Sequence, residues 1–160
     1  MQAPPVGTPE PTSDERTTAM LAHVLTIFAG FIASGVIYLA KRRDSRFIAF
    51  HALQAVLWHL WMFVVFFVAF AGFFVLMFAT VGFGHSPTHA PPGHDAPPPP
   101  AFFIGFFGFF GIWLVMMLSW AVNVGFCVYV AVQASSGRWT RYPLVGSLAR
   151  RLAQIPPDVG

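Results

Sequence analysis

The middle of this chain has almost no charge. Between Phe47 and Gly137 the 160-residue sequence contains no Lys or Arg, and Asp95 is the only acid. Charged residues make up 9% of the chain and hydrophobic residues 56%, whereas about 25% charged is usual for a soluble domain. This composition excludes an ordinary water-soluble domain and predicts an all-α integral membrane protein.

Other absences exclude several classes of function. Cys127 is the only cysteine, so an internal disulfide and a cysteine-based metal site within one chain are excluded. The six acids form no pair inside an apolar segment, and no Ser-His-acid set, glycine-rich phosphate loop or His-Glu metal motif occurs. The basic residues cluster beside apolar segments rather than along one polar face, which argues against nucleic acid. We therefore expect no enzyme activity, no cofactor and no nucleic-acid partner.

Three long apolar segments are present, over residues 20–40, 47–84 and 101–134. The first has 21 residues without formal charge, and at ~1.5 Å per residue it crosses a hydrocarbon core of about 30 Å. The other two are longer than one crossing requires but too short for two. We predict three transmembrane helices, the last two forming a hairpin, within a membrane domain at residues 20–143.

Residues outside these segments are polar, proline-rich or basic. Residues 1–19 are expected to form a disordered arm, and residues 85–100 form a proline- and histidine-rich loop that cannot continue a helix. Gly137 is suited to end the third helix in a left-handed cap. Residues 144–160 are expected to form a short basic helix at the membrane surface, with apolar groups at Leu144, Val145, Leu148, Leu152 and Ile155.

Basic residues lie beside two ends of the predicted spans, where we expect them to fix topology or contact lipid headgroups. They are Lys41, Arg42, Arg43 and Arg46 in the first loop, and Arg138, Arg141, Arg150 and Arg151 in the tail. Because positive residues favour the cytoplasmic side, three crossings place the N-terminus outside and the C-terminus in the cytoplasm of a bacterial inner membrane.

Four polar side chains lie inside or at the edge of apolar segments: His23, His51, Gln54 and His59. Such groups cost free energy in a membrane, so they are candidates for a role. They can cap backbone groups of a neighbouring helix, bind a lipid headgroup or relay protons. In the three-span topology, His23 lies toward the outer face and His51 toward the inner face, which is too far apart to share a metal.

The proline-rich loop offers weak candidates for a metal site, namely His85, His89, His94 and Asp95. Imidazoles and a carboxylate suit divalent transition metals. However, a His-x-x-x-His pair shares one face only on a helix, which the prolines exclude here. We therefore predict no metal site, and interpret these histidines as polar loop residues.

Small residues and one amide are candidates for helix packing or partner contact: Gly30, Ser34, Gly105, Gly108, Gly111 and Asn123. Gly30 and Ser34 are four apart and leave a groove for another helix, while Ser34 and Gly35 can kink the first segment. Asn123 is expected to donate an interhelical hydrogen bond. The surrounding phenylalanines face lipid, other helices or a partner.

Three stretches resemble a known family, in the same order and spacing. They are Asp14-Glu15-Arg16-Thr17 leading into Ala19 to His23, Asp44 to Phe47 leading into Phe50 to Ala55, and Gly137 to Pro143. The chain resembles small bacterial membrane proteins of unknown function, distantly related to a polytopic subunit of the chloroplast inner-envelope protein-import translocon. The resemblance implies a helical membrane fold. The plant relatives have four helices with both ends on one side, so it also implies an alternative topology, with the first segment bent at Ser34-Gly35 into a re-entrant pair.

Three functions are compatible with these patterns. The leading hypothesis is a non-enzymatic accessory or assembly subunit that packs against other integral subunits, or against itself as a homo-oligomer, among membrane lipids. The resemblance, with His23, His51 and Asn123, allows an oligomeric transport or protein-translocation component. A metal- or lipid-responsive element is the third.

Overall fold

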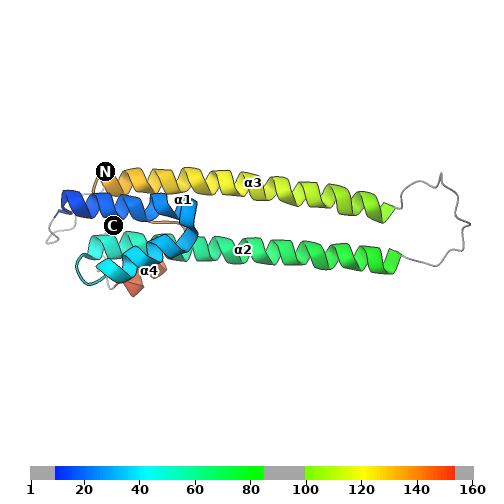
Figure 1. Ribbon diagram of the computed structural model, residues 1–160, viewed down its shortest axis with the longest axis horizontal. Coiled ribbons are helices and arrows are strands. Elements are labelled where there is room, and N and C mark those ends of the chain that lie inside the picture. The colour runs from blue at the N-terminus through cyan, green and yellow to red at the C-terminus, as the bar shows by residue number, and fades with distance from the viewer. Residues whose placement is uncertain (1–9, 85–99, 154–160) are drawn as a thin grey trace, which may run out of the picture. The chain divides into compact units, whose positions relative to one another are not determined.

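The computed structural model describes residues 10–84 and 100–153, which form four helices (Figure 1). They are α1 (Ser13–Lys41), α2 (Arg46–Gly84), α3 (Pro100–Ser135) and α4 (Gly146–Leu152), and the described part of the chain contains no strand. The first three are long and apolar enough to cross a membrane. This confirms the predicted all-helical membrane protein with a short C-terminal helix. The histidine loop at 85–99 and the tail from 154, including Ile155, lie outside the described residues.

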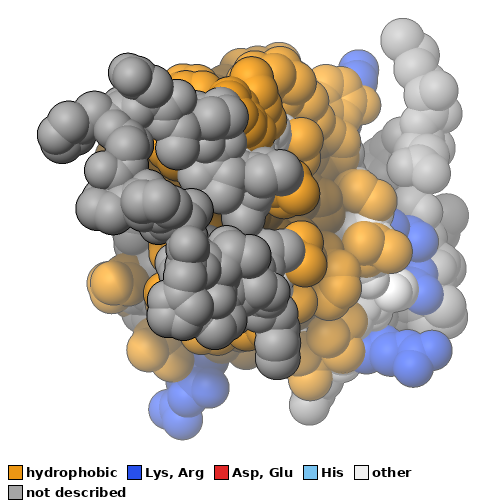
Figure 2. Space-filling view, turned by 90° about the vertical axis from the view of Figure 1, so that its right-hand side faces the viewer, with side chains coloured by type: hydrophobic (Ala, Val, Ile, Leu, Met, Phe, Trp, Pro, Cys, Tyr) orange, Lys and Arg blue, Asp and Glu red, His pale blue; other side chains and the backbone are white. Residues whose placement is uncertain are grey.

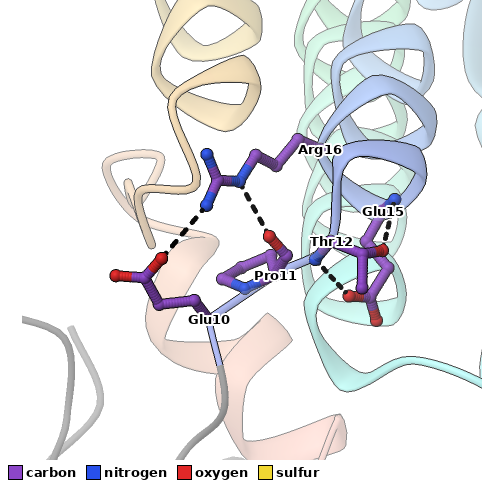
Figure 3. Close-up of polar contacts among 5 residues, drawn as sticks. All are labelled: Glu10, Pro11, Thr12, Glu15 and Arg16. Atoms are coloured by element: carbon purple, nitrogen blue, oxygen red, sulfur yellow. Dashed lines mark hydrogen bonds and ion pairs between the residues drawn. The ribbon is translucent and has the colours of Figure 1, made fainter.

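The start of α1 corrects the expected boundary of the N-terminal arm. The helix begins at Ser13, not after residue 19, because Thr12 and Glu15 form a capping box (Figure 3). The Thr12 N–H donates to the Glu15 carboxylate at 2.8 Å, and the Glu15 N–H donates to the Thr12 hydroxyl. Arg16 adds a hydrogen bond to the Pro11 carbonyl and an ion pair with Glu10. The Thr-x-x-Glu spacing is itself a sequence signal for such a helix start.

α1 is not one straight helix. At Gly30 the backbone has φ 58° and ψ −152°, a conformation that is essentially restricted to glycine. The Ser34 hydroxyl donates to the Ala22 carbonyl, although twelve residues span ~18 Å in a straight helix. The second half of α1 therefore folds back along the first (Figure 1). The single straight crossing expected for residues 20–40 is corrected to a helical hairpin, and the turn lies at Gly30 rather than at Ser34-Gly35.

The described residues fall into two compact units. Unit 1 contains the chain up to Phe63 and from Val122 onward, and unit 2 contains Val64–Ala121. The core of unit 1 joins α1, the first turns of α2, the last turns of α3 and α4. Its buried hydrophobic residues form three neighbouring clusters: Phe50, Leu53 and Ala149; Trp58, Val130, Tyr142 and Val145; and Ala19, Phe47 and Ala134.

Unit 2 is a pair of apolar helical segments from α2 and α3. Phe73 contacts Phe109, with ring centroids 6.2 Å apart. A Cβ added at Gly108 would lie 3.3 Å from the Phe73 ring, and one added at Gly105 would lie 3.9 Å from Met77. Gly105 and Gly108 therefore face α2, whereas a Cβ at Gly111 would have no neighbour within 4 Å.

The end of α3 follows the sequence prediction. Gly137 has φ 74°, its N–H donates to the Ala134 carbonyl, and the Arg138 N–H donates to the Gln133 carbonyl. These two bonds form a Schellman motif, which confirms the predicted left-handed cap. A Cβ on Gly137 would lie 3.1 Å from Nε of Arg16, so the end of α3 lies beside the start of α1.

Candidate functional site

A buried polar network in unit 1 joins residues from α1, α2 and the segment after α3. Nε2 of His23 lies 3.0 Å from Nδ1 of His51, and both side chains are fully buried. This corrects the expectation that the two histidines lie at opposite membrane faces. The reason is the reversal at Gly30, because a hairpin brings the first half of α1 back beside the start of α2.

The hydrogen bonds fix the tautomers of both rings. Nε2 of His51 lies 3.1 Å from the Arg138 carbonyl oxygen, which can only accept, so His51 carries its proton on Nε2. In a neutral ring Nδ1 then accepts, and His23 donates from its own Nε2. Nδ1 of His23 accepts in turn from the Tyr142 hydroxyl, at 3.2 Å. No ion pair with a carboxylate reaches these rings among the described residues, which favours neutral imidazoles at this depth.

The network continues through Tyr142 into α3. The Tyr142 oxygen lies 3.6 Å from Sγ of Cys127, and Cys127 lies 3.9 Å from Oδ1 of Asn123. The same Oδ1 accepts a 2.6 Å hydrogen bond from the indole N–H of Trp58. Asn123 thus makes an interhelical hydrogen bond, but its carbonyl oxygen accepts the bond, which corrects the expected donor role. Burial, together with the neighbouring thiol of Cys127, raises the pKa of the Tyr142 hydroxyl, so Tyr142 keeps the proton that it donates to His23.

The side chain of Gln54 in α2 forms hydrogen bonds with the backbone of the segment after α3. Its amide N–H donates to the Thr140 carbonyl at 2.9 Å, and its amide oxygen accepts from the Tyr142 N–H at 2.9 Å. The side chain is fully buried, so it replaces water for two backbone groups that no regular helix satisfies. Gly146 packs directly against it, because a Cβ there would lie 2.9 Å from the Gln54 oxygen.

His59 lies at the edge of this network. Its Nδ1 is 3.0 Å from the Ala55 carbonyl of its own helix, and its Nε2 is 3.9 Å from Sγ of Cys127. The described residues contain no group of three or more His, Cys, Asp or Glu side chains placed to hold a metal ion. The weak loop candidates His85, His89, His94 and Asp95 lie outside these residues.

The network of His23, His51, Gln54, Trp58, Asn123, Cys127 and Tyr142 has the properties of a structural clamp, and we refer to it as the clamp. Among the described residues, every buried side-chain nitrogen and oxygen atom has a hydrogen-bond partner. One end of the chain of bonds is the Arg138 carbonyl, which cannot pass a proton onward. Of the three roles considered for these histidines, backbone capping fits this geometry best. The network holds the α1 hairpin, α2 and the segment 138–142 together.

Sequence reasoning identified the histidines, Gln54 and Asn123 but missed three members of the clamp. Tyr142 lies in the third of the resembling stretches, and its position directly before Pro143 marks an ordered turn. The other two members are Trp58 and Cys127. Trp58 has no sequence signal for its partner Asn123, because the two residues are 65 positions apart in the chain. Cys127 lies only four positions from Asn123 and 15 from Tyr142.

Comparison with known proteins extends this description to a family. The model of the magnetosome magnetite crystal formation protein family (MamF/MmsF) matches residues 14–149. No curated protein and no solved structure matches the chain. The matched range includes all three resembling stretches, α1 from its second residue onward, α2, α3 and every residue of the clamp. The chain is a membrane protein with helices long enough to span a bilayer, and it belongs to the magnetosome magnetite crystal formation protein family.

Proposed function

We propose that this chain is a non-enzymatic accessory subunit of a membrane assembly that forms magnetite crystals, and that it acts by packing unit 2 against other integral subunits. Family membership over residues 14–149 supports the link to magnetite. The observation that carries the packing role is the apolar surface of unit 2, whose large hydrophobic side chains are mostly exposed in the described part of the chain. The magnetosome membrane is then its place of action.

The surface of unit 2 is large, aromatic and without charge. No charged side chain occurs in residues 64–84 or 100–121. Phe78, Phe107 and Val75 are 65%, 66% and 70% exposed, and many neighbours are similar. Two helices with this surface have no polar lining for a water-filled path. They fit lipid or the apolar surface of another subunit, where aromatic anchors contribute most of the binding energy.

We do not extend the proposal to transport or protein translocation. That hypothesis rests on the translocon resemblance and on His23, His51 and Asn123, but these three residues hydrogen-bond within the buried clamp. A role in which they line a passage would require the clamp to open. The accessory function requires no such change.

The geometry of α1 also changes the orientation that we propose. The positive residues of the first loop and the tail favour the cytoplasmic side for both. Because α1 reverses at Gly30, its start lies at the same end of unit 1 as its finish, beside Gly137. We therefore place both the start of α1 and the end of α3 on the cytoplasmic side.

Deletion and complementation in a magnetite-forming bacterium that carries this chain test the function. We expect deletion to reduce crystal size in electron micrographs, and the wild-type chain to restore it. We expect Phe107→Ala to restore it poorly at an equal level in the membrane, because loss of an aromatic anchor typically costs about 2 kcal/mol or more in an interface.

Phe28→Ala is the matched control, because Phe28 is 83% exposed near the turn of the α1 hairpin and outside the proposed partner surface. It should restore crystal size fully. Equal restoration by both variants would contradict the packing role, as would recovery of the chain from mild detergent only as a monomer with no co-purifying protein. Normal crystals after deletion would contradict the link to magnetite itself.

A further inference from the structure

The segment after α3 has an exposed apolar stripe on the side that faces away from the core. Leu148 and Leu152 lie four residues apart on one face of α4, and Leu144 lies four residues earlier. These three residues, the leucine stripe, are 47%, 55% and 74% exposed. Val145 and Ala149 are buried in the core of unit 1. The sequence had placed Val145 and the leucines on one face, whereas the structure divides them between the core and the surface.

Leu144 is held in a strained conformation that displays its side chain. It has φ 66°, the only positive φ of a residue other than glycine in the described part of the chain. Bulky residues rarely adopt this region. The strain disfavours the conformation by about 5- to 150-fold in its population, so surrounding contacts must impose it. Here Gln54 fixes Tyr142 on one side, and Gly146 packs against Gln54 on the other. The neighbouring contacts therefore hold an exposed leucine in place.

The unit that carries this stripe is rich in basic side chains. The described residues of unit 1 contain nine Lys and Arg against four Asp and Glu. Tyr38 of α1 and Ala149 of α4 pack on the same cluster of Phe50 and Leu53, so the first loop lies near α4. Arg42, Arg43 and Arg46 form no ion pair with a described residue, whereas Lys41 pairs with Asp44. In Figure 2 the charged side chains in view are Lys and Arg, and they lie beside hydrophobic side chains.

We propose that the leucine stripe, with Arg42, Arg43 and Arg151, is a binding surface for a leaflet of anionic phospholipid. Leucines beside arginines suit a membrane interface, where the apolar groups enter the acyl region and the guanidinium groups bind phosphate. A second copy of the chain would bring like charges together on this surface. This inference goes beyond the proposed function, because it concerns the membrane surface of unit 1 and not the partner surface of unit 2.

Lipid-selective quenching in the full chain tests the proposal. An environment-sensitive fluorophore is attached to the introduced cysteine of a Leu148→Cys variant. Labelling is selective for this position, because Cys127 is buried and inaccessible. The chain is reconstituted into vesicles of phosphatidylcholine and phosphatidylglycerol in equal amounts, with a trace of one or the other lipid spin-labelled on its acyl chain. We expect stronger quenching by labelled phosphatidylglycerol, by about fivefold for each contributing arginine at low salt. The preference should fall as salt screens the charges.

Two comparisons make the outcome specific. The combined Arg42→Gln, Arg43→Gln and Arg151→Gln variant should lose the preference, while Arg16→Gln, whose partner is Glu10, should keep it. A fluorophore at Leu118→Cys in unit 2 should be quenched equally by both lipids. Equal quenching at position 148, a water-like emission there, or an unchanged preference in the triple variant would each overturn the proposal.

Discussion

Gly30→Ala is expected to destabilise the folded chain by about 1–3 kcal/mol. The cause is the backbone and not a clash, because a Cβ on Gly30 would have no neighbour within 4 Å. With φ 58° and ψ −152°, the residue occupies a region that alanine avoids, so alanine favours straightening α1. Straightening would separate Ser34 from Ala22 and remove His23 from the clamp. Unfolding in mixed detergent micelles, followed by tryptophan fluorescence, measures this change.

Gly125→Ala is the matched control. Gly125 lies inside α3, and a Cβ there would also have no neighbour within 4 Å. Because alanine is favoured over glycine in a helix by about 0.5–1 kcal/mol, this substitution should stabilise the chain slightly. A loss of stability in Gly30→Ala together with a gain in Gly125→Ala would identify the turn at Gly30. If both variants are equally stable, or both more stable than wild type, the bend at Gly30 is not a feature of the folded protein.

His51→Phe is expected to cost about 2–4 kcal/mol, because it leaves two buried polar groups without a partner. These are the His23 Nε2–H and the Arg138 carbonyl. Phenylalanine keeps the ring contacts of His51 with Phe47 and Phe50, so the loss comes from hydrogen bonding and not from packing. The same micelle unfolding experiment measures the effect.

His59→Phe on the same helix provides the comparison. His59 bonds to a carbonyl of its own helix and only approaches Cys127, so its replacement should cost less than about 1 kcal/mol. A double-mutant cycle should also find strong coupling between His23 and His51, and little between His23 and His59. A larger cost at His59 than at His51 would show that the clamp does not hold unit 1 together.

The helices could be predicted because their signals are local. Long uncharged runs predicted α2 and α3, and Gly137 predicted the end of α3. The capping box at Thr12 and Glu15 was equally local, although the boundary was expected at residue 19. Each of these features depends on residues within one or two turns, so one stretch of sequence contains all the information.

The hairpin and the clamp could not be derived in this way. Gly30 has the same sequence appearance as a glycine in a packing groove, and only its φ and ψ identify the turn. The partners in the clamp are far apart along the chain: His51 follows His23 by 28 positions, and Tyr142 follows His23 by 119 positions. Placing the two histidines at opposite faces followed from the assumption of a straight helix. The same assumption of a straight α1 also prevented prediction of the contact between His23 and His51.

The central claim is that α1 folds back on itself, and the distance between Thr17 and Leu39 tests it directly. Spin labels at these two exposed positions, attached in the full chain in a bilayer, report the separation by pulsed electron paramagnetic resonance. The hairpin predicts a distance below about 20 Å, because packed helices lie 8–10 Å apart. A straight α1 would separate the two positions by ~33 Å, and a distribution centred there would contradict the account.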